Sequence, residues 1–188
     1  MKNIYTLLSI LIISLTVYLS FDDLMPSSVK SIESTGFSFD NALNHLKVIS
    51  KEPHYTGSKY HQDVQNYIVN ELKKMGLETE IQNQVVLSSR RVGTNAANII
   101  GTIKGSRKGK SLVLLTHYDS SAHSSFGASD AGSGVVTILE GFRAFLLNNN
   151  TPVNDIHLVF TDAEEMGLLG AEAFVKNHKL IDNVGLVL

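Results

Sequence analysis

The sequence contains no cysteine. This excludes disulfide bonds and thiolate metal ligands, so any bound metal ion must be held by His, Asp or Glu, while the redox compartment stays open. An excess of charge of one sign is also missing, because 16 basic and 18 acidic residues give a formal net charge of −2. A balanced charge gives no indication of a nucleic-acid partner. With 188 residues and 43% hydrophobic content, we expect one globular domain.

One long hydrophobic run lies at the N-terminus. Lys2 precedes an uncharged stretch over residues 3–21, which is close to the ~20 residues that a helix needs to cross a bilayer. A cleaved signal peptide has a shorter apolar region and a small-residue exit. We therefore expect a membrane anchor, with secretion as the alternative. Lys2 on one flank, with Asp22 and Asp23 on the other, favours an extracytoplasmic domain, in the periplasm, the lumen or outside the cell.

Composition divides the chain into a transmembrane anchor or signal (1–21), a Ser-rich linker (22–37) and a folded domain (38–188). Apolar spacing predicts helices from Phe39 with Ser38 as N-cap, and over 56–76, 134–150 and 167–178. Strands are expected over 77–87, at an edge, and over 96–105, 111–119, 156–160 and 184–188. The basic turn 106–110 indicates a hairpin between the second and third strands. The expected fold is α/β, with a mixed, largely parallel central sheet sandwiched by helices.

Polar side chains follow the strand that ends near residue 116. His117 and Asp119 are spaced i and i+2, so they point to the same side of a strand, and the carboxylate can orient the imidazole. Asp130 follows thirteen residues after His117 in a Gly- and Ser-rich loop. Each also has a structural explanation: the His and Asp can bond a loop, and Asp130 can cap the next helix.

Glu164 and Glu165 lie side by side after the next apolar strand. Acidic residues in the first turn of a helix need no function. However, two adjacent carboxylates in apolar surroundings are stabilised by a cation between them. Ligand sites in such sheets lie beyond the carboxyl ends of the strands. Because His117, Asp119 and Asp130 are expected at the same edge, the joint pattern favours a metal site.

The motifs His117-x-Asp119, GASDAGSG around Asp130 and TDAEEMGLLGA around Glu164 and Glu165 resemble metallopeptidase family 28. This family comprises co-catalytic zinc aminopeptidases and carboxypeptidases. The upstream EPHYTGS and GLETE segments are similar to its membrane-anchored endoplasmic-reticulum or vacuolar type. The resemblance implies that His117 and Glu165 each bind one of two zinc ions and that Asp130 bridges them. Glu164 would be the general base for a peptide substrate, and Asp119 would orient His117.

The family pattern also needs a carboxylate after the next strand and a later histidine. Since the sequence ends at Leu188, inside that strand, we expect the N-terminal part of an enzyme that is poorly active by itself. Other histidines are less suited as ligands. We expect His45, His61 and His178 to be solvated and His157 to begin a strand; His54 and His123 lie nearer the site, and His123 could reach substrate.

Several functions compete with a zinc aminopeptidase. A related di-zinc deacylase or carboxypeptidase also uses a His-x-Asp motif and a Glu-Glu pair, although the thirteen-residue spacing from His117 to Asp130 favours family 28. A single-zinc enzyme like glutaminyl cyclase is a third possibility. Outside enzymes, the chain could be a non-catalytic, membrane-tethered fragment or a pseudoenzyme.

Overall fold

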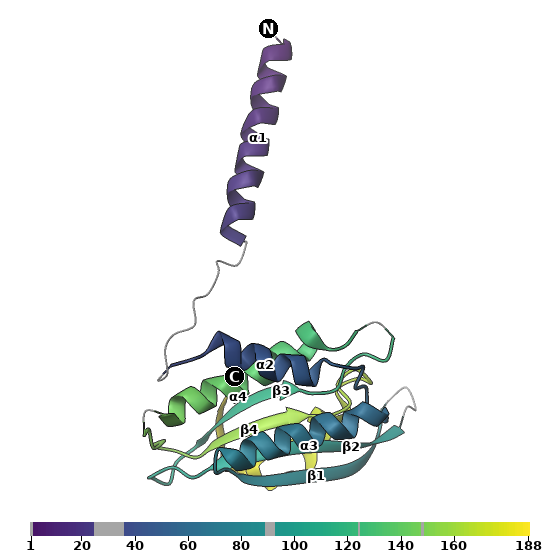
Figure 1. Cartoon of the computed structure of the whole chain (residues 1–188), viewed down its shortest axis with the longest axis vertical. Coiled ribbons are helices and arrows are strands. Elements are labelled where there is room, and N and C mark those ends of the chain that lie inside the picture. The colour runs from purple at the N-terminus through teal and green to yellow at the C-terminus, as the bar shows by residue number, and fades with distance from the viewer. Residues whose placement is uncertain (1, 25–35, 89–92, 124, 148) are drawn as a thin grey trace. The chain divides into compact units, whose positions relative to one another are not determined.

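The computed structural model describes residues 2–24, 36–88, 93–123, 125–147 and 149–188. The chain divides into two compact units, Met1–Ser31 and Ile32–Leu188, each of which is described by itself (Figure 1). Most of the expected linker, over residues 25–35, lies outside the described residues.

The first unit contains helix α1 (Lys2–Leu24). Its segment Ile4–Phe21 has a mean hydropathy of 2.1, and the side chains of this segment are all exposed. A helix of this length and composition can cross a membrane. The candidate span agrees with the apolar run that the sequence places before Asp22.

The second unit is built on a five-stranded mixed sheet, with strand order β1-β2-β4-β3-β5. The strands are β1 (Glu78–Leu87), β2 (Gly93–Ile103), β3 (Ser111–His117), β4 (Ile156–Thr161) and β5 (Val184–Val187). The β3–β4 and β3–β5 pairs are parallel, whereas β1–β2 and β2–β4 are antiparallel. The expected strand over 77–87 is therefore an edge strand, as predicted.

The predicted hairpin between β2 and β3 is wrong, because β4 lies between them. Ile100 of β2 pairs with Val159 of β4, and Leu115 of β3 pairs with the same residue from the other side. The basic turn after β2 instead bonds the segment before β4, through Ser106 N to Pro152 O at 2.9 Å and Arg107 N to Val153 O at 2.9 Å. β4 is almost wholly buried, so the centre of the sheet removes its apolar side chains from water.

The described residues of this unit also form the α-helices α2 (Phe39–Ile49), α3 (Lys59–Lys74), α4 (Ser133–Leu147) and α5 (Leu169–Asn177). The predicted cap is confirmed, since the Ser38 side chain accepts a hydrogen bond from Asn41 N. Helix α3 is followed by Gly76 at a φ of +79°, the left-handed conformation that glycine adopts without strain.

Alternate residues of the central strands pack on opposite faces of the sheet. Leu158 and Phe160 belong to the core under α2, α3 and α4, whereas Val159 packs with Phe174 of α5 on the other face. Figure 1 shows α2, α3 and α4 together on one side of the strands. The expectation of a mixed α/β sheet sandwiched by helices is confirmed. The sheet is not largely parallel, however, because the β1–β2 and β2–β4 pairs are antiparallel.

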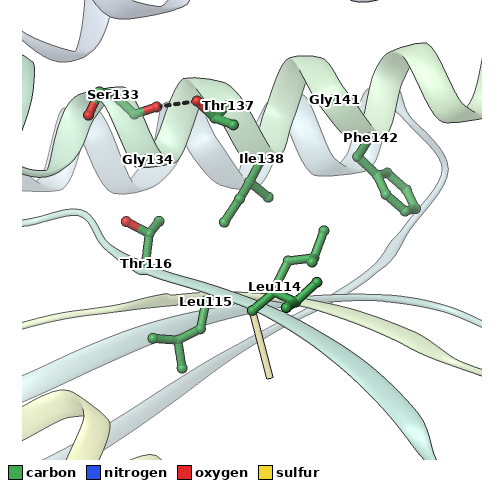
Figure 2. Close-up of a pocket in the computed structure, with 10 residues that line it drawn as sticks. Leu114, Leu115, Thr116, Ser133, Gly134, Thr137, Ile138, Gly141 and Phe142 are labelled. Carbon is green, nitrogen blue, oxygen red and sulfur yellow. Dashed lines mark hydrogen bonds between the residues drawn. The ribbon is translucent and has the colours of Figure 1, made fainter. Parts of the chain in front are cut away.

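An apolar cavity of about 410 Å³ lies between β3 and α4 (Figure 2). The helix approaches the strand closely at Gly134, where an added Cβ would lie 2.4 Å from Thr116 Oγ1. At Gly141 an added Cβ would meet nothing within 4 Å, so space remains under this end of the helix. None of the described residues that line this cavity has a titratable side chain.

Candidate metal centre and catalytic site

The carboxyl ends of β3 and β4 bring the two acidic motifs together. The strands are parallel and His117 pairs with Thr161, so the residues that follow each strand emerge at the same edge. Asp130 joins them from the irregular turn Ala128–Gly132, directly before α4. The sheet thus positions residues that are up to 48 positions apart, from His117 to Glu165.

His117 is the centre of this cluster. Its Nε2 lies 2.8 Å from Asp130 Oδ1 and 3.8 Å from Glu164 Oε2. Burial by itself would lower the pKa of His117, but hydrogen bonds and negative charge from Asp119 and Asp130, together with Glu164, raise it to about 9. The electrostatic field at this imidazole therefore favours positive charge.

Asp119 is fully buried and contacts both motifs. His117 Nδ1 lies 3.0 Å from the main-chain oxygen of Asp119 and 3.5 Å from its Oδ1. The carboxylate also accepts backbone hydrogen bonds from Glu164 N to Oδ1 at 3.0 Å and from Glu165 N to Oδ2 at 3.3 Å. Asp119 thereby links the imidazole to the turn that carries the adjacent glutamates.

The Glu165 side chain lies in the same field of negative charge. Burial raises its pKa, and repulsion from Asp130, Glu164 and Asp119 adds to the effect. The carboxylate also lines a pocket of about 280 Å³ with Tyr55 and the exposed His123. Glu165 therefore borders a space that is open to a ligand.

The donor chemistry of this cluster fits zinc, which is bound by imidazole nitrogen and carboxylate oxygen. His117 and Asp130 are in direct contact, and the surplus of carboxylates favours a cation. Among the residues that the structure describes, however, no group of three or more His, Asp or Glu side chains is arranged to hold a metal ion. The structure thus joins two of the three expected ligands, with Glu165 close enough for electrostatic interaction.

Sequence reasoning missed the polar residues behind this edge. His61, which we expected to be solvated, is 9% exposed, and its Nε2 lies 2.8 Å from Asp162 Oδ1. Thr56 Oγ1 donates to the same Oδ1 at 3.0 Å. The spacing of His61 with Val64 and Ile68 along the buried stripe of α3 would have indicated an inward-facing imidazole.

Of two further histidines, His178 differs from the expectation and His157 agrees with it. His178 was also expected to be solvated but is 8% exposed, because its ring stacks on Phe174 at 5.0 Å. His157 lies within β4 as the second residue of the strand, where it is buried.

Comparison with known proteins relates the segment that carries this cluster to a peptidase family. Residues 98–188 match Peptidase family M28. A vacuolar membrane protease of Candida albicans is 31% identical over 193 aligned residues, which cover 100% of this chain and 23% of that protein. The part of the chain that carries His117, Asp130 and the adjacent glutamates is therefore similar to Peptidase family M28. The whole chain spans about a quarter of the length of this curated relative.

Solved structures share the fold of this chain. A Zn-dependent exopeptidase from Parabacteroides distasonis matches with a TM-score of 0.65 at 25% identity, covering 77% of this chain and 57% of the other. A glutaminyl cyclase from Bacteroides thetaiotaomicron matches with a TM-score of 0.66 at 26% identity, covering 80% and 60%. The expected likeness to zinc exopeptidases is therefore confirmed for the fold.

Proposed function

We propose that this chain supplies the His-x-Asp and Glu-Glu motifs of a membrane-anchored, zinc-dependent exopeptidase, and specifically of an aminopeptidase. The observation that carries the proposal is the contact of His117 with Asp130 beside Glu164, at the shared edge of β3 and β4. The match to Peptidase family M28 supports peptide-bond hydrolysis, and the similarity to a Zn-dependent exopeptidase supports the metal.

His117, Asp130 and Glu165 would hold the metal, with two zinc ions in a complete site and Asp130 shared between them. Bound zinc lowers the pKa of a water molecule and polarises the scissile carbonyl group. The protein's contribution is to hold the imidazole and carboxylates at one edge and to keep the His117 ring oriented through the main-chain oxygen and carboxylate of Asp119.

Glu164 is proposed as the general base. Its backbone amide is held by Asp119 Oδ1, while its side chain is 33% exposed and reaches to 3.8 Å from His117 Nε2. In this position the carboxylate can accept a proton from water and donate it to the leaving amine. A separate role for each glutamate accounts for their adjacency: Glu165 binds metal, and Glu164 moves a proton.

The proposed location follows from α1. An apolar helix over Ile4–Phe21 supports a membrane anchor, and the Candida albicans relative is a vacuolar membrane protease. Lys2 before the span, with Asp22 and Asp23 after it, favours an extracytoplasmic or lumenal catalytic domain. Adding protease to sealed vesicles of the expressing cells, with and without detergent, tests this orientation.

A substrate panel tests the reaction. Zinc content and turnover of the intact protein are measured on aminoacyl, acyl-amino-acid and N-terminal glutaminyl substrates side by side. We expect bound zinc and the highest kcat/KM on aminoacyl substrates, with loss of turnover after chelation. Zinc-independent turnover, or a protein with less than one zinc per chain and no turnover, would overturn the proposal and favour a non-catalytic fragment.

The second candidate is a glutaminyl cyclase-like enzyme. It is favoured by the structural match to the Bacteroides thetaiotaomicron glutaminyl cyclase. Cyclisation releases ammonia from an N-terminal glutamine, whereas peptidase action releases an amino acid. Ammonia release without peptide cleavage in the same panel would identify the cyclase, and preference for acyl-amino acids would identify the deacylase or carboxypeptidase alternative.

A further inference from the structure

A buried polar cluster lies directly behind the Glu-Glu turn. Asp162 is 0% exposed and is surrounded by donors. Its Oδ1 accepts from Thr56 Oγ1, from the backbone of Ala163 at 2.7 Å, and from His61 Nε2; its Oδ2 accepts from Ala97 N at 2.9 Å. Because a carboxylate can only accept, the proton in the His61–Asp162 bond resides on Nε2.

This cluster joins three parts of the chain. Thr56 lies in the loop before α3, His61 is in the first turn of α3, and Asp162 follows β4. The His61 ring stacks on Tyr118 at 5.0 Å, and the Tyr118 hydroxyl donates to Ala97 O at 3.0 Å. Helix α3 is thereby fixed to the ends of both parallel strands.

Thr56 connects the cluster to the candidate site. Its hydroxyl, which donates to Asp162 at 3.0 Å, also lies 3.5 Å from Asp119 Oδ2. Asp119 in turn accepts the amides of Glu164 and Glu165. Two buried carboxylates thus face one hydroxyl group, and a buried carboxylate is stable only when its oxygens are hydrogen-bonded.

We propose that Thr56, His61 and Asp162 are positioning residues, which lock Asp119 and the start of the turn so that the adjacent glutamates are held in a fixed orientation. Asp162 accepts a hydrogen bond from the Ala163 amide at the start of the turn. Thr56 holds Asp119 in the position where it accepts the amides of Glu164 and Glu165. This inference rests on the proposed function, because it concerns the residues assigned there as general base and metal ligand.

The test uses amide hydrogen exchange in the intact chain, measured at Glu164 and Glu165. Thr56→Val removes the hydroxyl with little change of shape, and Thr56→Ser retains it. In Thr56→Val we expect exchange at these two amides to accelerate by about 2- to 10-fold, the factor that corresponds to the loss of one typical hydrogen bond. In Thr56→Ser we expect recovery to the wild-type rate.

Thr79→Val is the matched control. Thr79 lies on edge strand β1, and its hydroxyl donates to the nearby main-chain oxygen of Leu77 at 3.2 Å. This substitution leaves exchange at Glu164 and Glu165 unchanged if the positioning effect is specific. Unchanged exchange at both amides in Thr56→Val overturns the proposal, as does an equal acceleration over the whole domain, which would indicate a general loss of stability.

Zinc titration of the same variants provides a second readout. We expect Thr56→Val to weaken Zn²⁺ binding by about 10-fold or more, as for other residues that orient ligands, and Thr56→Ser to restore it. The two proposals fail in different ways. A wild-type protein that neither binds zinc nor cleaves substrate overturns the proposed function, whereas the exchange rates still decide whether Thr56 holds the turn.

Discussion

His117 Nε2 lies 2.8 Å from Asp130 Oδ1, so the end of β3 contacts the loop before α4 across thirteen residues of sequence. If this pair binds metal, Asp130→Asn lowers Zn²⁺ affinity by at least about 10-fold, because an amide is a weaker ligand than a carboxylate and carries no charge. Isothermal titration calorimetry with Zn²⁺ measures the change. Asp63→Asn, the same substitution at an exposed residue of α3, is the matched control; an equal effect of both substitutions would contradict the assignment.

Glu164→Gln separates proton transfer from metal binding. The substitution keeps the shape and the backbone amide that Asp119 holds, but it removes the base. We expect kcat to fall by about 10²- to 10⁴-fold, while zinc content stays at the wild-type level. Glu172→Gln, on the exposed surface of α5, serves as the matched control. Full activity of Glu164→Gln would mean that another group accepts the proton.

Glu140 makes stability dependent on pH. This buried carboxylate accepts from the Arg143 guanidinium and from Ser38 N at 2.7 Å. Burial would raise the pKa of Glu140, but the bonds from Arg143 and Ser38 outweigh burial and lower it. The resulting stability is present above the unfolded-state pKa of 4.5 and is lost as pH falls through the lower folded-state value.

Glu140→Gln is therefore expected to lower the free energy of unfolding by about 1.5–3 kcal/mol at pH 7, because the substitution removes the hydrogen bonds to a charged carboxylate. The difference from wild type shrinks below pH 4.5, as the wild-type carboxyl becomes protonated. Urea unfolding at several pH values measures both effects. The exposed pair Glu172–Lys176 gives the control, because Glu172→Gln changes stability by about 0.5 kcal/mol or less.

Replacement of glycine by alanine is expected to change stability in opposite directions at two positions. At Gly170, an added Cβ would lie 2.1 Å from the main-chain oxygen of Asp162 and 2.4 Å from Asn98 Oδ1. Gly170→Ala is expected to destabilise the domain by about 1–3 kcal/mol through overpacking. Gly141 faces the open cavity under α4, where an added Cβ meets nothing within 4 Å. Gly141→Ala is expected to stabilise the domain by about 0.5–1 kcal/mol through higher helix propensity. Thermal unfolding of both variants tests the pair; a loss of stability in Gly141→Ala would contradict the open space seen there.

Local patterns in the sequence were sufficient for most elements. The Ser38 cap, the apolar stripe of α3 and the buried run of β4 each depend on residues within a few positions of one another, and the structure confirms all three. The site residues were grouped for a similar reason, since polar residues that follow parallel strands share one edge. Their roles as ligands and base stay predictions.

The sequence by itself determined the apolar N-terminal helix, the alternation of strands and helices, and the edge at which His117, Asp130 and Glu164 meet. Only the tertiary structure decided that β4 separates β2 from β3. It also decided that His61 is buried against Asp162, 101 residues further along the chain. The physical reason is the same in both cases: periodicity reports which face of an element is apolar, whereas strand order and buried polar pairs depend on partners that only folding brings into contact.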